Sequence, residues 1–104
     1  MRAYERLLKY VSVYTTSDPD SATVPSSMRQ YDLANILVDE LKALVLENVH
    51  VDENGVVYGW LSATAGCEQK PALGFIAHLD TAPDCSGENV KPQIIEHYDG
   101  GDVL

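Results

Sequence analysis

His78 and Asp80 are the residues whose types and spacing most directly suggest chemistry. They follow the apolar run of residues 72–77, and side chains two apart on an extended strand point to the same face. A neutral imidazole binds zinc through either ring nitrogen, and a carboxylate on the other nitrogen fixes its tautomer. The same spacing also suits a histidine that is hydrogen-bonded to a carboxylate for structural reasons alone. The pattern by itself leaves a metal site and a structural pair both open.

The other potential ligands give weaker signals. His50 alternates with two valines and His97 sits in a polar tail, so both are expected on the surface. Cys67 and Cys85 lie eighteen residues apart without a Cys-x-x-Cys spacing, which predicts unpaired thiols and gives little support to a zinc pair. Cys85 follows Asp80 closely enough to approach the site, but a small buried thiol is the more common arrangement.

Two helices are expected to precede this site. Apolar residues recur at helical spacing over residues 3–14 and again over 28–44, with a loop of turn-forming residues between them. Ser27 and Gln30 have the spacing of a capping box at the start of the second helix. Val45 stands where a helix commonly ends with glycine in a left-handed conformation, so either a strained helix end or a different kind of helix end is expected there.

Strands are expected after the second helix. Asn54-Gly55 between alternating segments predicts a hairpin, with residues 56–61 as the return strand. The run 72–77 suits a strand buried on both faces, and 93–97 suits a short final strand. The expected fold is therefore α/β, with two N-terminal helices packed on a mixed sheet of about three to four strands.

Composition excludes several classes of partner. The 104 residues fit at most one small domain, and 7 basic against 16 acidic residues give a formal net charge of −9. That balance argues against nucleic acid and against an anionic membrane surface. Charges at Arg2, Glu5 and Arg6 occupy the place of a signal peptide's apolar stretch, and no apolar run approaches the ~18 residues of a membrane span. A cytoplasmic location is expected.

The sequence of residues 74–87, Gly-Phe-Ile-Ala-His-Leu-Asp-Thr-Ala-Pro-Asp-Cys-Ser-Gly, resembles the first metal-site segment of the peptidase T family. These are tripeptide aminopeptidases of the di-zinc aminopeptidase/carboxypeptidase superfamily. The resemblance extends from about residue 4 to residue 104 and includes segments 8–17, 24–26, 40–44, 89–94 and 98–102. Val45 departs from the family, in which glycine is usual after the second helix.

The resemblance implies a function and an incomplete site. His78 would ligate one of two zinc ions, and Asp80 would be the catalytic-site aspartate that holds the His78 ring. A zinc-bridging water would attack the peptide carbonyl of a short peptide, most simply a tripeptide, to release its N-terminal residue. The family's bridging aspartate, glutamate base and remaining ligands lie beyond residue 104. Residues 1–104 are therefore expected to be an N-terminal fragment of the catalytic domain, inactive alone and prone to self-association through exposed apolar surfaces.

Two alternatives stay open at this point. One is a stand-alone, non-catalytic binding or regulatory module with the same fold. The other is a related di-zinc hydrolase that acts on acylated amino acids and shares the His-x-Asp pattern. Residues 82–98 resemble the peptidase T flanks, and this favours the aminopeptidase.

Overall fold

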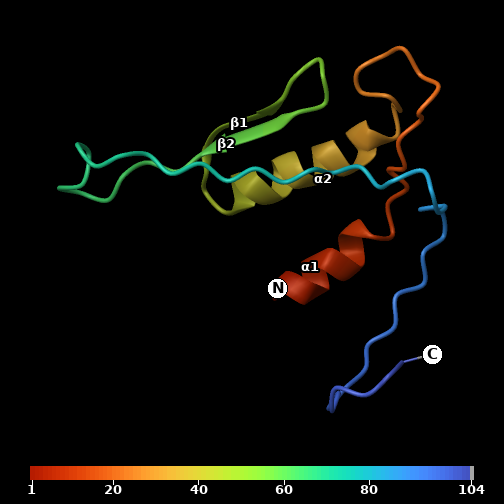
Figure 1. Cartoon of the computed structure of the whole chain (residues 1–104). Coiled ribbons are helices and arrows are strands. Elements are labelled where there is room, and N and C mark those ends of the chain that lie inside the picture. Colours follow the sequence, from red (N-terminus) through yellow and green to blue (C-terminus); the bar gives the residue numbers. More distant parts are fainter. Residues whose placement is uncertain (104) are drawn as a thin grey trace.

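Two helices and one β-hairpin form the regular structure of the computed structural model, which describes residues 1–103 (Figure 1). In chain order these are α1 (Ala3–Tyr10), α2 (Gln30–Ala43), β1 (Glu47–Val51) and β2 (Val57–Trp60). The expected α/β class, with the helices first, is confirmed. Over the described residues, no helix is long and apolar enough to cross a membrane.

The hairpin forms where Asn54-Gly55 predicts it. β1 and β2 pair antiparallel, and Gly55 adopts a φ of 79°, a conformation that costs glycine nothing. The Asp52 carboxylate accepts hydrogen bonds from the backbone N–H groups of Asn54 (3.0 Å) and Val56 (2.8 Å), which closes the turn. The Tyr31 hydroxyl of α2 donates to the Glu53 carbonyl at 2.8 Å. Hydrogen bonds therefore stabilise the turn internally and also join it to α2, the helix on which the hairpin packs.

Helix α2 begins later than the Ser27 capping box predicts. Its first residue is Gln30, and no side chain caps its N-terminus. The backbone N–H of Gln30 instead donates to the Ser27 carbonyl at 3.1 Å, which makes residues 27–30 a turn. The capping box is wrong because the Gln30 amide contacts the hydroxyls of Ser17 and Ser26, and no side chain makes a capping hydrogen bond at the start of α2.

The end of α2 confirms the expected strain. Val45 has a φ of 63°, which a β-branched residue adopts only at a cost. The N–H of Leu46 donates to the Leu41 carbonyl at 3.1 Å and that of Val45 to the Lys42 carbonyl at 2.9 Å. These two bonds form a Schellman motif, which requires a left-handed residue at position 45. Valine therefore occupies the position that suits glycine best.

The sheet is smaller than expected. Among residues 1–103 only β1 and β2 pair as strands, so the prediction of three to four strands is corrected to two. Residues 72–77 are extended but unpaired, and their large side chains are exposed: Leu73 79%, Phe75 90% and Ile76 102%. Residues 93–97 are irregular and end in a turn, so the predicted final strand is also wrong. A strand needs a neighbour for its N–H and C=O groups, and no described segment pairs with either run.

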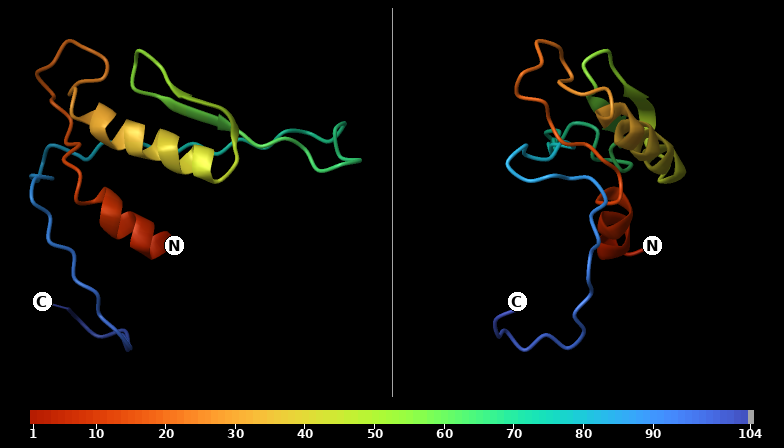
Figure 2. Two further views of the ribbon diagram at one scale, coloured as in Figure 1. Left: turned by 180° about the vertical axis from the view of Figure 1, so that it is seen from behind. Right: turned by 90° about the vertical axis from the view of Figure 1, so that its right-hand side faces the viewer.

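The buried apolar core is correspondingly small. Its members come from one face of α2: Leu33, Ala34 and Val38. The radius of gyration is 17.0 Å, against about 13 Å for a compact domain of this length. Figure 2 shows why, because residues 88–103 run away from α2 and the hairpin in both views. The arrangement near α2 therefore depends on polar ties as much as on apolar packing.

One such tie joins α1 to α2 through the Glu40 carboxylate. Arg6 and Lys9 of α1 donate to it at 2.7 and 2.6 Å, and the Tyr10 hydroxyl donates to it as well. The Glu40 side chain is only 14% exposed. The hydrogen bonds from Lys9, Tyr10 and Arg6 lower the pKa of Glu40 from 4.5 to about 2. Three side chains of α1 thus converge on one carboxylate of α2.

We predict that this tie makes stability depend on acid pH. Because the pKa of Glu40 is lower in the folded chain than in the unfolded chain, its stabilising contribution is complete above pH 4.5 and is lost as the pH falls toward about 2. Glu40→Gln should lower the thermal midpoint at neutral pH and flatten its dependence between these two values. Thermal melts followed by circular dichroism measure both effects. Asp39→Asn, which alters the exposed neighbouring carboxylate, should leave the pH dependence intact, and an unchanged profile in Glu40→Gln would refute the tie.

Candidate active site

The site is built where two segments far apart in the sequence are joined by their backbones. Thr16 and Thr81 form an isolated parallel bridge. The N–H of Ser17 donates to the Thr81 carbonyl at 3.0 Å, and the N–H of Thr81 donates to the Thr15 carbonyl at 3.4 Å. The hydroxyls of Thr16 and Thr81 are also 2.9 Å apart. Figure 1 shows the two segments crossing near the start of α2. Thr15 and Thr16 are buried there and Thr81 is exposed, so the bridge is shielded from water on one side.

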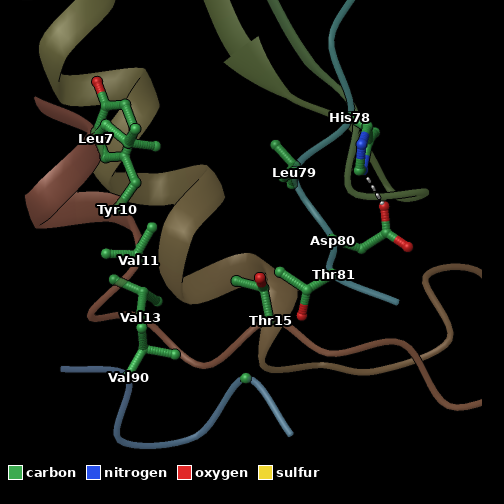
Figure 3. A pocket seen from close by; sticks show the side chains of 11 residues that line it. Leu7, Tyr10, Val11, Val13, Thr15, His78, Leu79, Asp80, Thr81 and Val90 are labelled. Atoms are coloured by element: carbon green, nitrogen blue, oxygen red, sulfur yellow. Dashed lines mark hydrogen bonds and ion pairs between the residues drawn. The ribbon is translucent and has the colours of Figure 1, made fainter. Parts of the chain in front are cut away.

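His78 and Asp80 form the pair that their spacing predicts. The Nδ1 of His78 lies 3.0 Å from one carboxylate oxygen of Asp80. The segment is extended, and Figure 3 shows Leu79 pointing toward α1 while the His78–Asp80 pair lies on the other side of the chain. Side chains therefore alternate between the two sides of this extended segment, as the spacing of His78 and Asp80 predicts. This holds even though residues 72–77 do not form the predicted buried strand.

A second residue holds the Asp80 carboxylate. The Ser17 hydroxyl donates to the oxygen that His78 does not contact. The hydrogen bond from Ser17 is the main cause that lowers the pKa of Asp80; partial burial opposes it, and the hydrogen bond from His78 adds a smaller lowering. Asp80 is therefore a carboxylate at neutral pH, and each of its oxygens has a partner.

An open, mostly apolar hollow of about 280 Å³ lies between α1 and this segment (Figure 3). Its walls come from α1, from the loop that follows α1, from the segment with His78 and Asp80, and from the chain after that segment. The lining residues are Leu7, Tyr10, Val11, Val13, Thr15, His78, Leu79, Asp80, Thr81, Gly87 and Val90. The Glu40 tie therefore also sets the position of one wall, because it fixes α1.

Gly87 closes the bridge from a third segment. Its N–H donates to the Thr16 hydroxyl at 3.0 Å. A Cβ atom at this position would lie 2.5 Å from that hydroxyl oxygen and 2.8 Å from the hydroxyl oxygen of Thr81. Such distances are far inside van der Waals contact, so only glycine fits here without displacing one of the two threonines.

The remaining candidate ligands lie elsewhere. Cys67 and Cys85 are unpaired, as predicted, but Cys85 is exposed and not the buried thiol that the sequence favoured. His50 is exposed and stacks on Tyr58 with ring centroids 5.1 Å apart, and His97 is exposed in the tail. No group of three His, Cys, Asp or Glu side chains is placed to hold a metal ion within the described part of the chain. His78 is thus one potential metal ligand with one supporting carboxylate.

Sequence reasoning missed the residues that surround this pair. Thr16, Ser17 and Gly87 fall in predicted loops, and Gln30 falls at the predicted start of a helix. Two of the contacts span long sequence separations, 63 residues for Ser17 and Asp80 and 71 for Thr16 and Gly87. Periodicity reports only neighbours along the chain, so it carries no signal for such contacts.

We predict that Gly87→Ala loosens this junction. The added methyl group must push against the Thr16 and Thr81 hydroxyls, and overpacking of this kind costs about 1–3 kcal/mol. Denaturant titration should show a lower free energy of unfolding. Gly74→Ala is the matched control, since a Cβ there meets nothing within 4 Å. Equal stability of the two variants would show that Gly87 is not confined as described.

Comparison with known proteins agrees with the motifs. No protein-family model matches the chain. Peptidase T of Geobacillus thermodenitrificans (strain NG80-2) is 56% identical over 100 residues, which make up 96% of this chain and 24% of that relative. Peptidase T of Aliivibrio fischeri (strain ATCC 700601 / ES114) is 55% identical over 96 residues, 92% of this chain and 23% of that relative. The chain spans about a quarter of the length of the curated relatives it matches, 24% in the first case. The predicted resemblance to peptidase T is therefore confirmed over 96% of this chain.

Proposed function

We propose that the whole protein is a cytoplasmic, zinc-dependent aminopeptidase that releases the N-terminal residue from tripeptides. Residues 1–104 would form the first part of its catalytic domain and would be inactive in isolation. The similarity to peptidase T over 96% of the chain supports the peptidase assignment. The His78–Asp80 pair supports a metal-dependent mechanism.

The hydrogen bond between His78 and Asp80 is the observation that carries this proposal. Because Nδ1 of His78 faces the Asp80 carboxylate at 3.0 Å, the ring would keep its proton on Nδ1 and present the lone pair of Nε2 outward. This carboxylate–histidine arrangement is the usual support of a histidine bound to zinc. His78 would therefore hold one zinc ion, and Asp80 would keep the ring in the binding tautomer. The chemistry of this donor pair thus fits zinc.

The bound zinc would polarise the peptide carbonyl and activate a water molecule at neutral pH. Catalytic zinc needs about three protein ligands per ion, and within residues 1–103 no cluster of three donors occurs. The proposal therefore assigns His78 as the one metal ligand of this part of the protein and Asp80 as its catalytic-site carboxylate. The other ligands of a two-zinc site would have to come from elsewhere in the whole protein.

We also propose that copies of this chain self-associate through residues 72–77. The run is extended, uncharged and free of proline, and Phe75 and Ile76 are almost fully exposed. Two such runs can pair edge to edge as antiparallel strands. Light scattering should show dimers or larger species, and Ile76→Lys should reduce their amount. Leu61→Lys, which changes an exposed leucine outside this run, should leave their amount unchanged. A strictly monomeric chain would contradict this proposal.

A chimera tests the proposed activity. Peptidase T of Geobacillus thermodenitrificans, with its matching quarter replaced by this chain, should hydrolyse tripeptides when zinc is supplied. His78→Ala should reduce kcat/KM by more than about a hundredfold, and Asp80→Asn by about 10- to 100-fold, the usual loss for a partner of a metal ligand. His50→Ala serves as the matched control, because it removes an exposed histidine that lies outside the site.

The outcomes separate the alternatives. Full activity in His78→Ala would remove this residue from the metal site. Hydrolysis of acylated amino acids in preference to tripeptides would favour the related di-zinc hydrolases. Appreciable tripeptide hydrolysis by residues 1–104 alone would contradict the claim that this part of the protein is inactive in isolation. An inactive chimera that folds and binds zinc would refute the aminopeptidase assignment.

A further inference from the structure

We infer that Ser17 is a positioning residue for the metal-binding imidazole, acting through Asp80. A chain of hydrogen bonds runs from Gln30 through Ser17 and Asp80 to His78. It joins the first residue of α2 to the ring proposed to hold zinc. The role in metal binding rests on the proposed function, whereas the hydrogen bonds from Gln30 to His78 are a property of this structure alone.

Ser17 is held at both its backbone and its side chain. Its N–H donates to the Thr81 carbonyl at 3.0 Å, which places it directly beside Asp80. Its hydroxyl oxygen accepts a hydrogen bond from the Gln30 amide at 3.5 Å. The hydroxyl has a single hydrogen to donate, and with Gln30 acting as donor that hydrogen is directed to the Asp80 carboxylate.

Gln30 is suited to orient this hydroxyl because it is itself fixed. It is one of the few buried polar residues, with 8% of its surface exposed. The same Nε2 atom also lies 3.4 Å from the Ser26 hydroxyl. The amide therefore spans two serines of the loop before α2, and only one of them contacts Asp80. Ser26 consequently provides an internal comparison for Ser17.

The two partners of Asp80 together determine its orientation. Ser17 engages one carboxylate oxygen and His78 the other. The terminal torsion of an aspartate is broad when nothing holds it, and the His78 side chain is 83% exposed, so the surrounding structure does little to hold the ring. Without Ser17 the carboxylate would turn more freely and would select the Nδ1–H tautomer of His78 less strongly. Ser17 thus favours the ring state in which Nε2 can bind a metal.

Nitrogen-15 NMR of the metal-free chain measures this tautomer directly. With the pH raised until the shifts of the two ring nitrogens no longer change, these shifts report the tautomer ratio of the neutral ring. Ser17→Ala should shift the His78 ratio toward Nε2–H by about threefold, less than the full worth of a hydrogen bond to a charged group because the effect reaches His78 through Asp80. Ser17→Thr, which keeps the hydroxyl, should restore it. Asp80→Asn gives the full effect, and Ser26→Ala should leave the ratio unchanged.

Gln30→Glu provides a second test that does not remove the serine. It places a carboxylate acceptor opposite the Ser17 hydroxyl, draws that hydrogen away from Asp80, and adds a negative charge that a helix N-terminus tolerates well. It should shift the tautomer ratio in the same direction as Ser17→Ala, and it decides the question if Ser17→Ala unfolds the chain. An unchanged ratio in Gln30→Glu and in a folded Ser17→Ala, with a clear shift in Asp80→Asn, would overturn the inference.

These measurements need neither zinc nor substrate, so they are independent of the proposed activity. A shifted tautomer beside an inactive chimera would support the positioning role and refute the peptidase. An unshifted tautomer ratio together with an active chimera would overturn the positioning role and support the peptidase.

Discussion

The pairing of Thr16 with Thr81 is the interaction on which the site depends. It joins segments 65 residues apart, and it brings Ser17 beside Asp80 and Gly87 against the two threonine hydroxyls. Closing so long a loop costs conformational entropy, which the contacts at the junction must offset. Two backbone hydrogen bonds, a hydroxyl pair and the Gly87 amide do so within a partly buried polar region. The position of the His78–Asp80 pair relative to the helices follows from this junction.

The structure relies on polar ties because its apolar core is small. Besides Pro25, only Leu33, Ala34 and Val38 have buried apolar side chains among the described residues, and α1 is held to α2 by three donors on Glu40. Among the described side chains, no buried polar atom lacks a hydrogen-bond partner. Satisfied polar groups hold a unique geometry well, whereas unsatisfied ones are costly. This explains how an open chain with exposed residues 72–77 can still hold a defined pair at positions 78 and 80.

Sequence reasoning succeeded where the signal is local. Asn54-Gly55 indicated the hairpin, helical periodicity indicated both helices, and the two-residue period of an extended chain indicated the His78–Asp80 hydrogen bond. It failed for residues 72–77 because a strand requires a second segment, and apolar composition does not reveal whether one is present. It also failed for Ser17, whose partner is 63 residues away and leaves no periodic trace. Thus the two polar residues of the pair were predictable, and the residues that hold them were not.

Native-state amide hydrogen exchange is the most direct test of the junction between residues 15–17 and residue 81. The amides of Ser17 and Gly87, which donate to Thr81 and Thr16, should exchange slowly and with similar protection, because they open together. Amides of residues 93–95, which are irregular and exposed, should exchange at the rate of an unprotected chain. Exchange at Ser17 and Gly87 as fast as in residues 93–95 would contradict this dependence on the junction, since the junction would then not persist in solution.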